Sequence, residues 1–138
     1  MVIAVDFDGT IVEEAYPAIG KPIPFAIEVL KKLQNEEHHQ LILWTVREGK
    51  LLDDAVNYCR ERGVEFYAVN KLYPEDDNVL SPRKIAADIF IDDRSVGGLP
   101  DWGLIYRMIT KNLTLEKALE VQNELHKDNK GFFKKLFV

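Results

Sequence analysis

Short apolar runs alternate along the chain with stretches in which apolar residues recur at helical spacing. Short apolar runs between polar segments are typical of strands buried on both faces, and recurrence every three or four residues is typical of amphipathic helices. The runs predict strands at 2–5, 41–44, 65–69 and 89–91. The stretches predict helices at 25–35 and 51–59, and Gly63 follows the second at a position that favours helix termination.

The later part of the chain carries two further helix signals. The Ser-Pro pair at 81–82 is typical of a helix N-terminus, so we expect Lys84 near the start of a helix. Thr114 can cap a last helix, which we expect to end near Gly131. The tail at 128–138 combines aromatic residues with lysines, which favours docking onto the protein body or a subunit contact over association with a membrane surface.

Strands that alternate with helices predict right-handed crossovers and a doubly wound α/β fold, with a parallel sheet covered by helices on both faces. A length of 138 residues fits one domain, 1–138. In open sheets of this kind, ligands bind beyond the carboxyl ends of the strands, near the point where strand order reverses. The residues that follow each predicted strand are therefore the first candidates for a functional site.

Composition and charge narrow the class of protein. A net charge of -5 argues against extended nucleic acid as a partner, because such binding requires Lys and Arg to neutralise many phosphates. Cys59 is the single cysteine, so it cannot form an internal disulfide, and its place on an apolar helical stripe predicts a core thiol. We expect no secretion signal, because no cationic stretch followed by an apolar one marks the start, and no apolar run reaches about 18 residues. We therefore expect a cytoplasmic protein without a membrane span.

Acidic residues gather at the ends of two predicted strands. Asp6 and Asp8 follow the first strand, and Asp92 and Asp93 follow the fourth. Like charges collected at one site are costly unless a cation neutralises them. The available ligands are hard oxygens, so we expect Mg²⁺, held by Asp6, Asp8 and Asp92. Asp93 is expected either as a further ligand or as a residue that orients Lys84 or a water on the metal.

Carboxylates at such a site can attack a phosphate ester. Asp6 is expected to attack phosphorus and form an aspartyl-phosphate, which divides one difficult displacement into two easier steps. Asp8 projects to the same side if the backbone stays extended, so it can protonate the leaving oxygen and later deprotonate the attacking water. Gly9 allows the chain to turn sharply, and Thr10 can orient Asp8.

Thr45 and Lys84 are the candidates for binding the phosphate group. Thr45 ends the second strand and offers a hydroxyl with nearby backbone N–H groups, whereas Lys84 offers a compact positive charge to the phosphate and the nucleophile. We expect both to line the phosphate site with Gly9, and Lys84 to be catalytic as well. Arg47 and Arg94 could contact the leaving group or form surface salt bridges, and the sequence leaves both interpretations open.

In this order, the motifs resemble those of the haloacid dehalogenase superfamily of phosphohydrolases. The resemblance rests on Asp-Phe-Asp-Gly-Thr at 6–10, Thr45, Lys84 and the aspartate pair at 92–93, and it spans about residues 1–98. It implies a Rossmann-like fold, a Mg²⁺ cofactor and a reaction through an aspartyl-phosphate on Asp6.

The spacing of the motifs bears on the shape of the site. Many members of that superfamily carry a cap domain, inserted after the first motif or between the second and third. Here 8–45 holds a loop, a helix and a strand, and 45–84 holds a helix, a strand and a loop. The chain therefore resembles a capless member with an open site. In that family an open site goes with larger substrates or with a neighbouring subunit over the site, which would be a homo-oligomer here.

Two alternatives differ from a phosphatase acting on small molecules or nucleotides. Segments 45–48 and 91–94 are similar to the phosphatase half of polynucleotide kinase-phosphatases, which favours a polynucleotide 3′-phosphatase, although the acidic charge favours a small substrate. A receiver-like phosphoacceptor module also combines acids, a threonine and a lysine. Its phosphorylated aspartate should end the third strand, which ends here near Val69 and Asn70 without an acid. A phosphomutase or a dehalogenase fits an open site rich in carboxylates less well.

Overall fold

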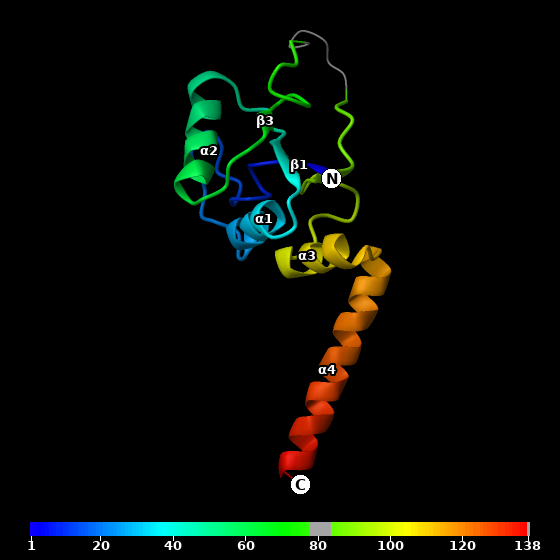
Figure 1. The fold of residues 1–138 in the computed structure, drawn as a ribbon. Coiled ribbons are helices and arrows are strands. Elements are labelled where there is room, and N and C mark those ends of the chain that lie inside the picture. The colour runs from blue at the N-terminus through cyan, green and yellow to red at the C-terminus, as the bar shows by residue number, and fades with distance from the viewer. Residues whose placement is uncertain (78–83, 138) are drawn as a thin grey trace. The chain divides into compact units, whose positions relative to one another are not determined.

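A computed structural model of the chain describes residues 1–77 and 84–137, with side chains for 1–77 and 84–128. The chain divides into two compact units, one ending at Leu99 and the other beginning at Pro100 (Figure 1). The expectation of a single domain stays a prediction.

The first unit is built on a parallel four-stranded sheet. Its strands lie in the order β3-β2-β1-β4. They are β1 (Val2–Val5), β2 (Gln40–Leu43), β3 (Ala68–Val69) and β4 (Ile89–Ile91). The predicted α/β fold with a Rossmann-like parallel sheet is confirmed, and β1 and β4 have the predicted bounds. The third strand is shorter than predicted, because only Ala68 and Val69 pair in register with β2.

Two helices follow the first two strands, as predicted. Helix α1 (Ala26–Asn35) buries residues spaced by three, one and three positions, which form one face of a helix. These residues are Ala26, Val29, Leu30 and Leu33. Helix α2 (Gly49–Glu61) buries Ala55 and Cys59. Cys59 is buried, so the prediction of a core thiol is confirmed, and burial raises the pKa of this thiol to about 12.

The order of the strands reverses beside β1. The chain moves outward from β1 through β2 to β3 and then returns to place β4 on the other side of β1. Val5 pairs with Leu43 on one side and with Ile91 on the other, and the Asp6 backbone N–H donates to the Ile91 carbonyl at 3.0 Å. A ligand site is expected beyond the carboxyl ends of the strands at this reversal. The residues after Val5 and Ile91 lie at that place.

The segment between β3 and β4 differs from the sequence prediction. Residues 84–87 have no helical structure, so Lys84 does not lie near the start of a helix as expected. The Ser-Pro pair at 81–82, on which that prediction rested, lies outside the described residues. The Ser-Pro signal is local and does not by itself supply the amphipathic stretch that stabilises a helix by packing.

The second unit consists of two consecutive helices that contact each other, α3 (Trp102–Lys111) and α4 (Leu115–Phe137). The Asp101 carboxylate caps α3 by accepting from the Leu104 backbone N–H at 3.0 Å, and Asn112 ends the helix in the left-handed conformation, with φ of 52°. The Thr114 hydroxyl caps α4, as predicted, by accepting from the Lys117 N–H at 3.2 Å.

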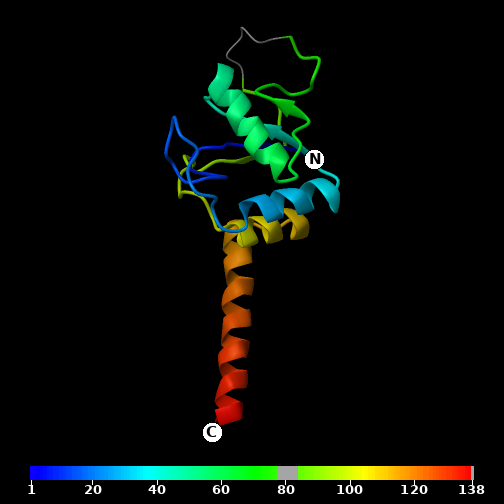
Figure 2. The ribbon, with the colours of Figure 1, turned by 90° about the vertical axis from the view of Figure 1, so that its left-hand side faces the viewer.

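Helix α4 is longer than the sequence indicated. Figure 2 shows it as one unbroken helix, which passes the expected end at Gly131 and reaches Phe137. A glycine inside a helix costs only about 1 kcal/mol relative to alanine, so it does not have to end one. None of the described helices combines the length and the apolar composition required to cross a membrane.

Candidate functional site

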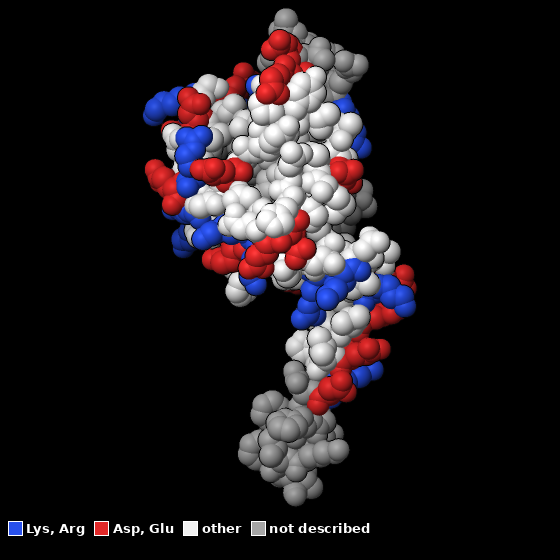
Figure 3. Space-filling model, in the orientation of Figure 1, with Lys and Arg blue, Asp and Glu red and all other residues white. Residues whose placement is uncertain are grey.

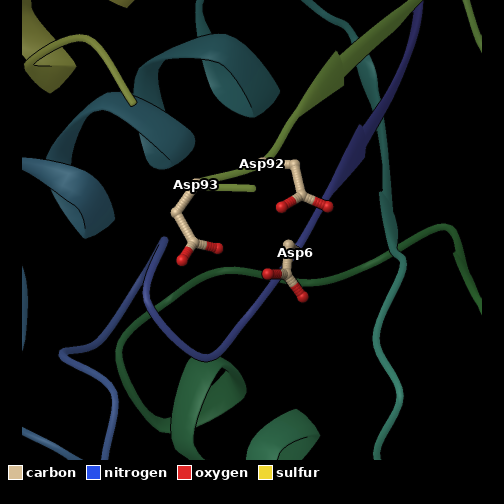
Figure 4. A group of neighbouring side chains, drawn as sticks. All are labelled: Asp6, Asp92 and Asp93. Atoms are coloured by element: carbon tan, nitrogen blue, oxygen red, sulfur yellow. The ribbon is translucent and has the colours of Figure 1, made fainter. Parts of the chain in front are cut away.

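Three carboxylates converge at the point where the strand order reverses. Asp6 follows β1, and Asp92 and Asp93 follow β4. One oxygen from each lies within 4.8 Å of the others, and Figure 4 shows the three side chains directed toward the same space. All three residues are partly buried. The structure thus brings together three of the four carboxylates that were expected at one site. We call these three residues the aspartate cluster.

The Thr10 hydroxyl holds this cluster in place. Thr10 is fully buried, and its Oγ1 accepts from the Asp93 backbone N–H at 3.0 Å. Its hydroxyl hydrogen can donate to Asp93 Oδ1 at 3.1 Å or, less closely, to Asp6 Oδ2 at 3.5 Å. We expected Thr10 to orient Asp8. It contacts the carboxylates of Asp93 and Asp6 instead, because the turn after β1 directs it toward the end of β4.

Gly9 is the position at which the chain approaches Asp93 most closely. Its φ is +81°, in the left-handed region that side-chain-bearing residues rarely adopt. A Cβ atom at this position would overlap the Asp93 carboxylate, lying 2.7 Å from Cγ. Glycine is therefore required both for the turn and for the space that Asp93 occupies. A contact of Gly9 with phosphate stays a prediction.

The surroundings of Asp6 disfavour its charged form. Burial, together with the neighbouring carboxylates of Asp92 and Asp93, raises the pKa of Asp6 to about 7, although a hydrogen bond from the Phe7 backbone N–H opposes the shift. Negative charges held this close are stabilised by a cation that they can share. The cluster therefore has the electrostatic character of a cation site.

The raised pKa predicts how the metal-free protein responds to pH. The folded state holds a proton on Asp6 up to about pH 7, whereas the unfolded chain releases it near the ordinary pKa of 3.8. Stability should therefore fall as pH rises from about 4 to 7. Asp6→Asn should raise the free energy of unfolding by about 2 kcal/mol at pH 8, after allowance for partial exposure, and by little at pH 4.

Urea denaturation at the two pH values, with a chelator present, measures this difference. Asp53→Asn, which removes an exposed carboxylate from α2, is the matched control and should change little at either pH. If Asp6→Asn raised the free energy of unfolding equally at pH 4 and pH 8, the raised pKa of Asp6 would not be the cause.

Asp8 is not a member of the aspartate cluster, and the expectation that it binds metal with Asp6 and Asp92 stays a prediction. Alternate residues project to the same side only while a strand continues, but β1 ends at Val5 and the chain turns at 9–11. The Asp8 carboxylate forms a buried ion pair with Arg47 instead. Nη2 of Arg47 donates to Oδ1 at 2.7 Å and Nε donates to Oδ2 at 2.8 Å.

Arg47 is a buried residue of the site that sequence reasoning left undecided. It is only 1% exposed, which excludes a surface salt bridge. Its guanidinium lies 5.1 Å from the centroid of the Phe7 ring and 5.2 Å from that of Tyr16. The sequence held one usable signal, the position of Arg47 two residues after the strand-end threonine, but nothing that assigned its partner.

Thr45 lies two residues beyond the end of β2, close to its predicted place at the end of that strand. Its backbone N–H donates to Asn70 Oδ1 at 2.8 Å, and its hydroxyl oxygen accepts from the Arg47 N–H at 3.2 Å. Asn70 follows β3 in the left-handed conformation, with φ of 54°, so its side chain holds the end of the neighbouring strand. Sequence reasoning missed Asn70 as a site residue, although Asn directly after a strand is a signal for this conformation.

The structure does not place Lys84 against the carboxylates. Lys84 is exposed, and its Nζ lies 4.9 Å from the centroid of the Phe90 ring. Among the described residues, no ion pair joins Lys84 to Asp6, Asp92 or Asp93. Its catalytic role stays a prediction. Arg94 contributes its backbone, which donates to Asp92 Oδ1 at 2.8 Å, and its side chain is exposed.

Comparison with known proteins connects the chain to one solved structure. No family model matches the chain, and neither does any curated protein. The solved structure of a conserved protein coded by a locus from Bacteroides thetaiotaomicron is 64% identical in sequence, with a TM-score of 0.79. The match covers 84% of this chain and 94% of the Bacteroides protein. This chain therefore belongs to the same family as that conserved Bacteroides protein.

Proposed function

We propose that the protein is a Mg²⁺-dependent phosphohydrolase of the haloacid dehalogenase type, which cleaves a phosphate monoester through an aspartyl-phosphate on Asp6. The observation that carries the proposal is the convergence of Asp6, Asp92 and Asp93 within 4.8 Å at the reversal of strand order. Such a convergence of acids, each from a strand end, serves no evident packing purpose.

The aspartate cluster fits Mg²⁺ by the chemistry of its donors. All three ligands would be carboxylate oxygens, which hard divalent cations prefer over the nitrogen and sulfur ligands of zinc. Relative to the expected ligand set, Asp93 takes the place of Asp8. A bound Mg²⁺ would supply positive charge that neutralises the phosphoryl oxygens and the carboxylates.

The residues of the chain would divide the reaction between them. A carboxylate oxygen of Asp6 attacks phosphorus, and the bond to the leaving oxygen breaks, with a proton from Asp8. In the second step water attacks the phosphorus of the aspartyl-phosphate, Asp8 accepts the proton, and the oxygen of Asp6 is released with its electron pair. The Thr45 hydroxyl and nearby N–H groups are proposed to stabilise charge on the phosphoryl group, with Lys84 as a further cation.

The substrate is proposed to be a small phosphorylated molecule or a nucleotide. The net charge is -5, and over α2 in Figure 3 basic side chains are interspersed with acidic ones. A surface of this kind gives an extended polynucleotide no continuous basic track. A cytoplasmic location is part of the proposal, since the single cysteine is a buried free thiol. A second copy of the chain over the open site stays a prediction.

Removal of Mg²⁺ tests the proposed function. We expect the protein to release phosphate from at least one member of a panel of sugar phosphates, nucleotides, phosphopeptides and 3′-phosphorylated oligonucleotides. A chelator should lower this rate by more than about 10²-fold, because the charges of the aspartate cluster would then repel the phosphate, and added Mg²⁺ should restore it.

Two outcomes would oppose the proposal. If the rate is unchanged by the chelator, the metal has no role. If calorimetry finds no Mg²⁺ binding even with a phosphate mimic present, the aspartate cluster is not a cation site. Preference for the oligonucleotide would favour the polynucleotide phosphatase, and an aspartyl-phosphate that lasts for hours would favour the receiver-like module.

A further inference from the structure

The ion pair between Asp8 and Arg47 is part of a network that uses every N–H donor of the Arg47 side chain. Both oxygens of Asp8 accept from the guanidinium, at 2.7 and 2.8 Å. The remaining N–H groups of Arg47 donate to the backbone carbonyls of Ala18 at 2.9 Å, Pro17 at 3.2 Å and Leu51 at 3.4 Å. All five donors of the side chain are thus engaged. In this state Arg47 has no N–H group left to offer to a substrate.

These contacts fix the position of the Asp8 carboxylate. A guanidinium is planar and grips a carboxylate through two parallel hydrogen bonds, so it sets the orientation of the group as well as its location. The carbonyls of Pro17, Ala18 and Leu51 hold the guanidinium in turn. Each Asp8 oxygen accepts one N–H and retains a second lone pair, which leaves room to take a proton.

A purely structural role does not account well for this arrangement. Buried ion pairs contribute little net stability compared with apolar residues of similar volume, because both charges lose their hydration. Asp8 lies two residues beyond Asp6, and its partner Arg47 lies two residues beyond Thr45. The pair therefore joins the segments that follow β1 and β2, both of which contribute to the proposed active site.

We infer that Arg47 is a positioning residue, which holds the carboxylate of Asp8 where it can act as the base on the attacking water. The inference rests on the proposed function and extends it to a residue that would not touch the substrate. Without Arg47, the Asp8 side chain would lose the two parallel hydrogen bonds that fix its rotamer. Hydrolysis of the aspartyl-phosphate would then slow to the extent expected when Asp8 itself is removed.

An activated aryl phosphate separates the two steps of the reaction. With dinitrophenyl phosphate and Mg²⁺, Asp6 forms its bond to phosphorus while the bond to the aryl oxygen breaks, and the aryl oxide leaves with the electron pair and needs no proton. The second step still needs a base, because water forms the new bond to phosphorus and must lose a proton. Loss of the base should therefore allow the first step and delay the second.

The test is stopped-flow release of dinitrophenolate by full-length variants. Asp8→Asn and Arg47→Gln should each give a burst of about one equivalent per protein, followed by turnover at least about 10²-fold slower than in the unsubstituted protein. Mass spectrometry of the quenched protein should find the phosphoryl group retained. The double variant should be no slower than Asp8→Asn alone. Arg62→Gln, which removes an exposed arginine that stacks on Tyr58, is the control and should show no burst.

Arg47→Lys keeps the test decisive if Arg47→Gln fails to fold. Lysine retains the charge but cannot donate to both oxygens in a fixed fork, so the burst should again appear. If Asp8→Asn gives a burst and neither folded Arg47 variant does, the inference is overturned while the proposed function stands. If the unsubstituted protein does not turn over the substrate with Mg²⁺, or if Asp6→Asn matches it, the proposed function fails instead.

Discussion

Asp6→Asn is expected to lower phosphate release by at least about 10⁴-fold, because asparagine cannot attack phosphorus to form the covalent intermediate. The substitution keeps the size of the side chain. Asp6 bonds to Ile91 through its backbone N–H, which the substitution does not change. The fold should therefore survive. Steady-state rates with the best substrate of the panel, measured with Mg²⁺ on both proteins, give the comparison.

The loss of activity alone would not identify the nucleophile, since Asp6 is also proposed to bind the metal. Rapid acid quenching of the active protein, followed by mass spectrometry of its peptides, should find the phosphoryl group on the peptide that contains Asp6. Asp53→Asn serves as the control for the loss of one negative charge and should retain full activity. Phosphorylation elsewhere, or undiminished turnover by Asp6→Asn, would reject Asp6 as the nucleophile.

The sheet was predictable because its two central strands, β1 and β2, are buried along most of their length. Such strands appear as short apolar runs, and β1 and β4 have the bounds that their runs indicated. The third strand was harder, because Phe66 and Tyr67 continue the apolar pattern but lie outside the residues that pair in register with β2. Helix α3 was missed although Asp101 and Asn112 were present as signals for its two ends. The polar and glycine-containing segment before it obscured them.

The aspartate cluster was predictable in part. Asp6, Asp92 and Asp93 end neighbouring parallel strands, so topology alone brings them together. The ion pair of Asp8 was missed because the alternation of side chains was extended beyond the end of the strand. Its true partner lies 39 positions away along the chain. Contacts across such a distance depend on how loops pack in three dimensions, which neither periodicity nor motif spacing specifies.

Arg47→Met should destabilise the protein more than any other single change considered. It leaves the Asp8 carboxylate, which is 9% exposed, without its cation, and an unpaired buried charge costs about 3–5 kcal/mol. Proteins of this size are stable by only about 5–15 kcal/mol, so the substitution should bring the chain close to unfolding at moderate temperature. Urea denaturation followed by circular dichroism measures the effect. Arg62→Met, at an exposed ion pair, should change stability by less than about 1 kcal/mol.

The double variant Arg47→Met/Asp8→Asn separates two possible sources of the stability that Arg47→Met loses. If most of the loss comes from an unpaired carboxylate, removal of its charge should recover a large part of it, and the two substitutions should be strongly non-additive. If the loss comes instead from the carbonyls of Pro17, Ala18 and Leu51, which Arg47 also satisfies, the double variant should be no more stable than Arg47→Met. Recovery in stability without recovery of turnover would separate the two roles of the pair, since the double variant restores charge balance and still lacks a positioned base.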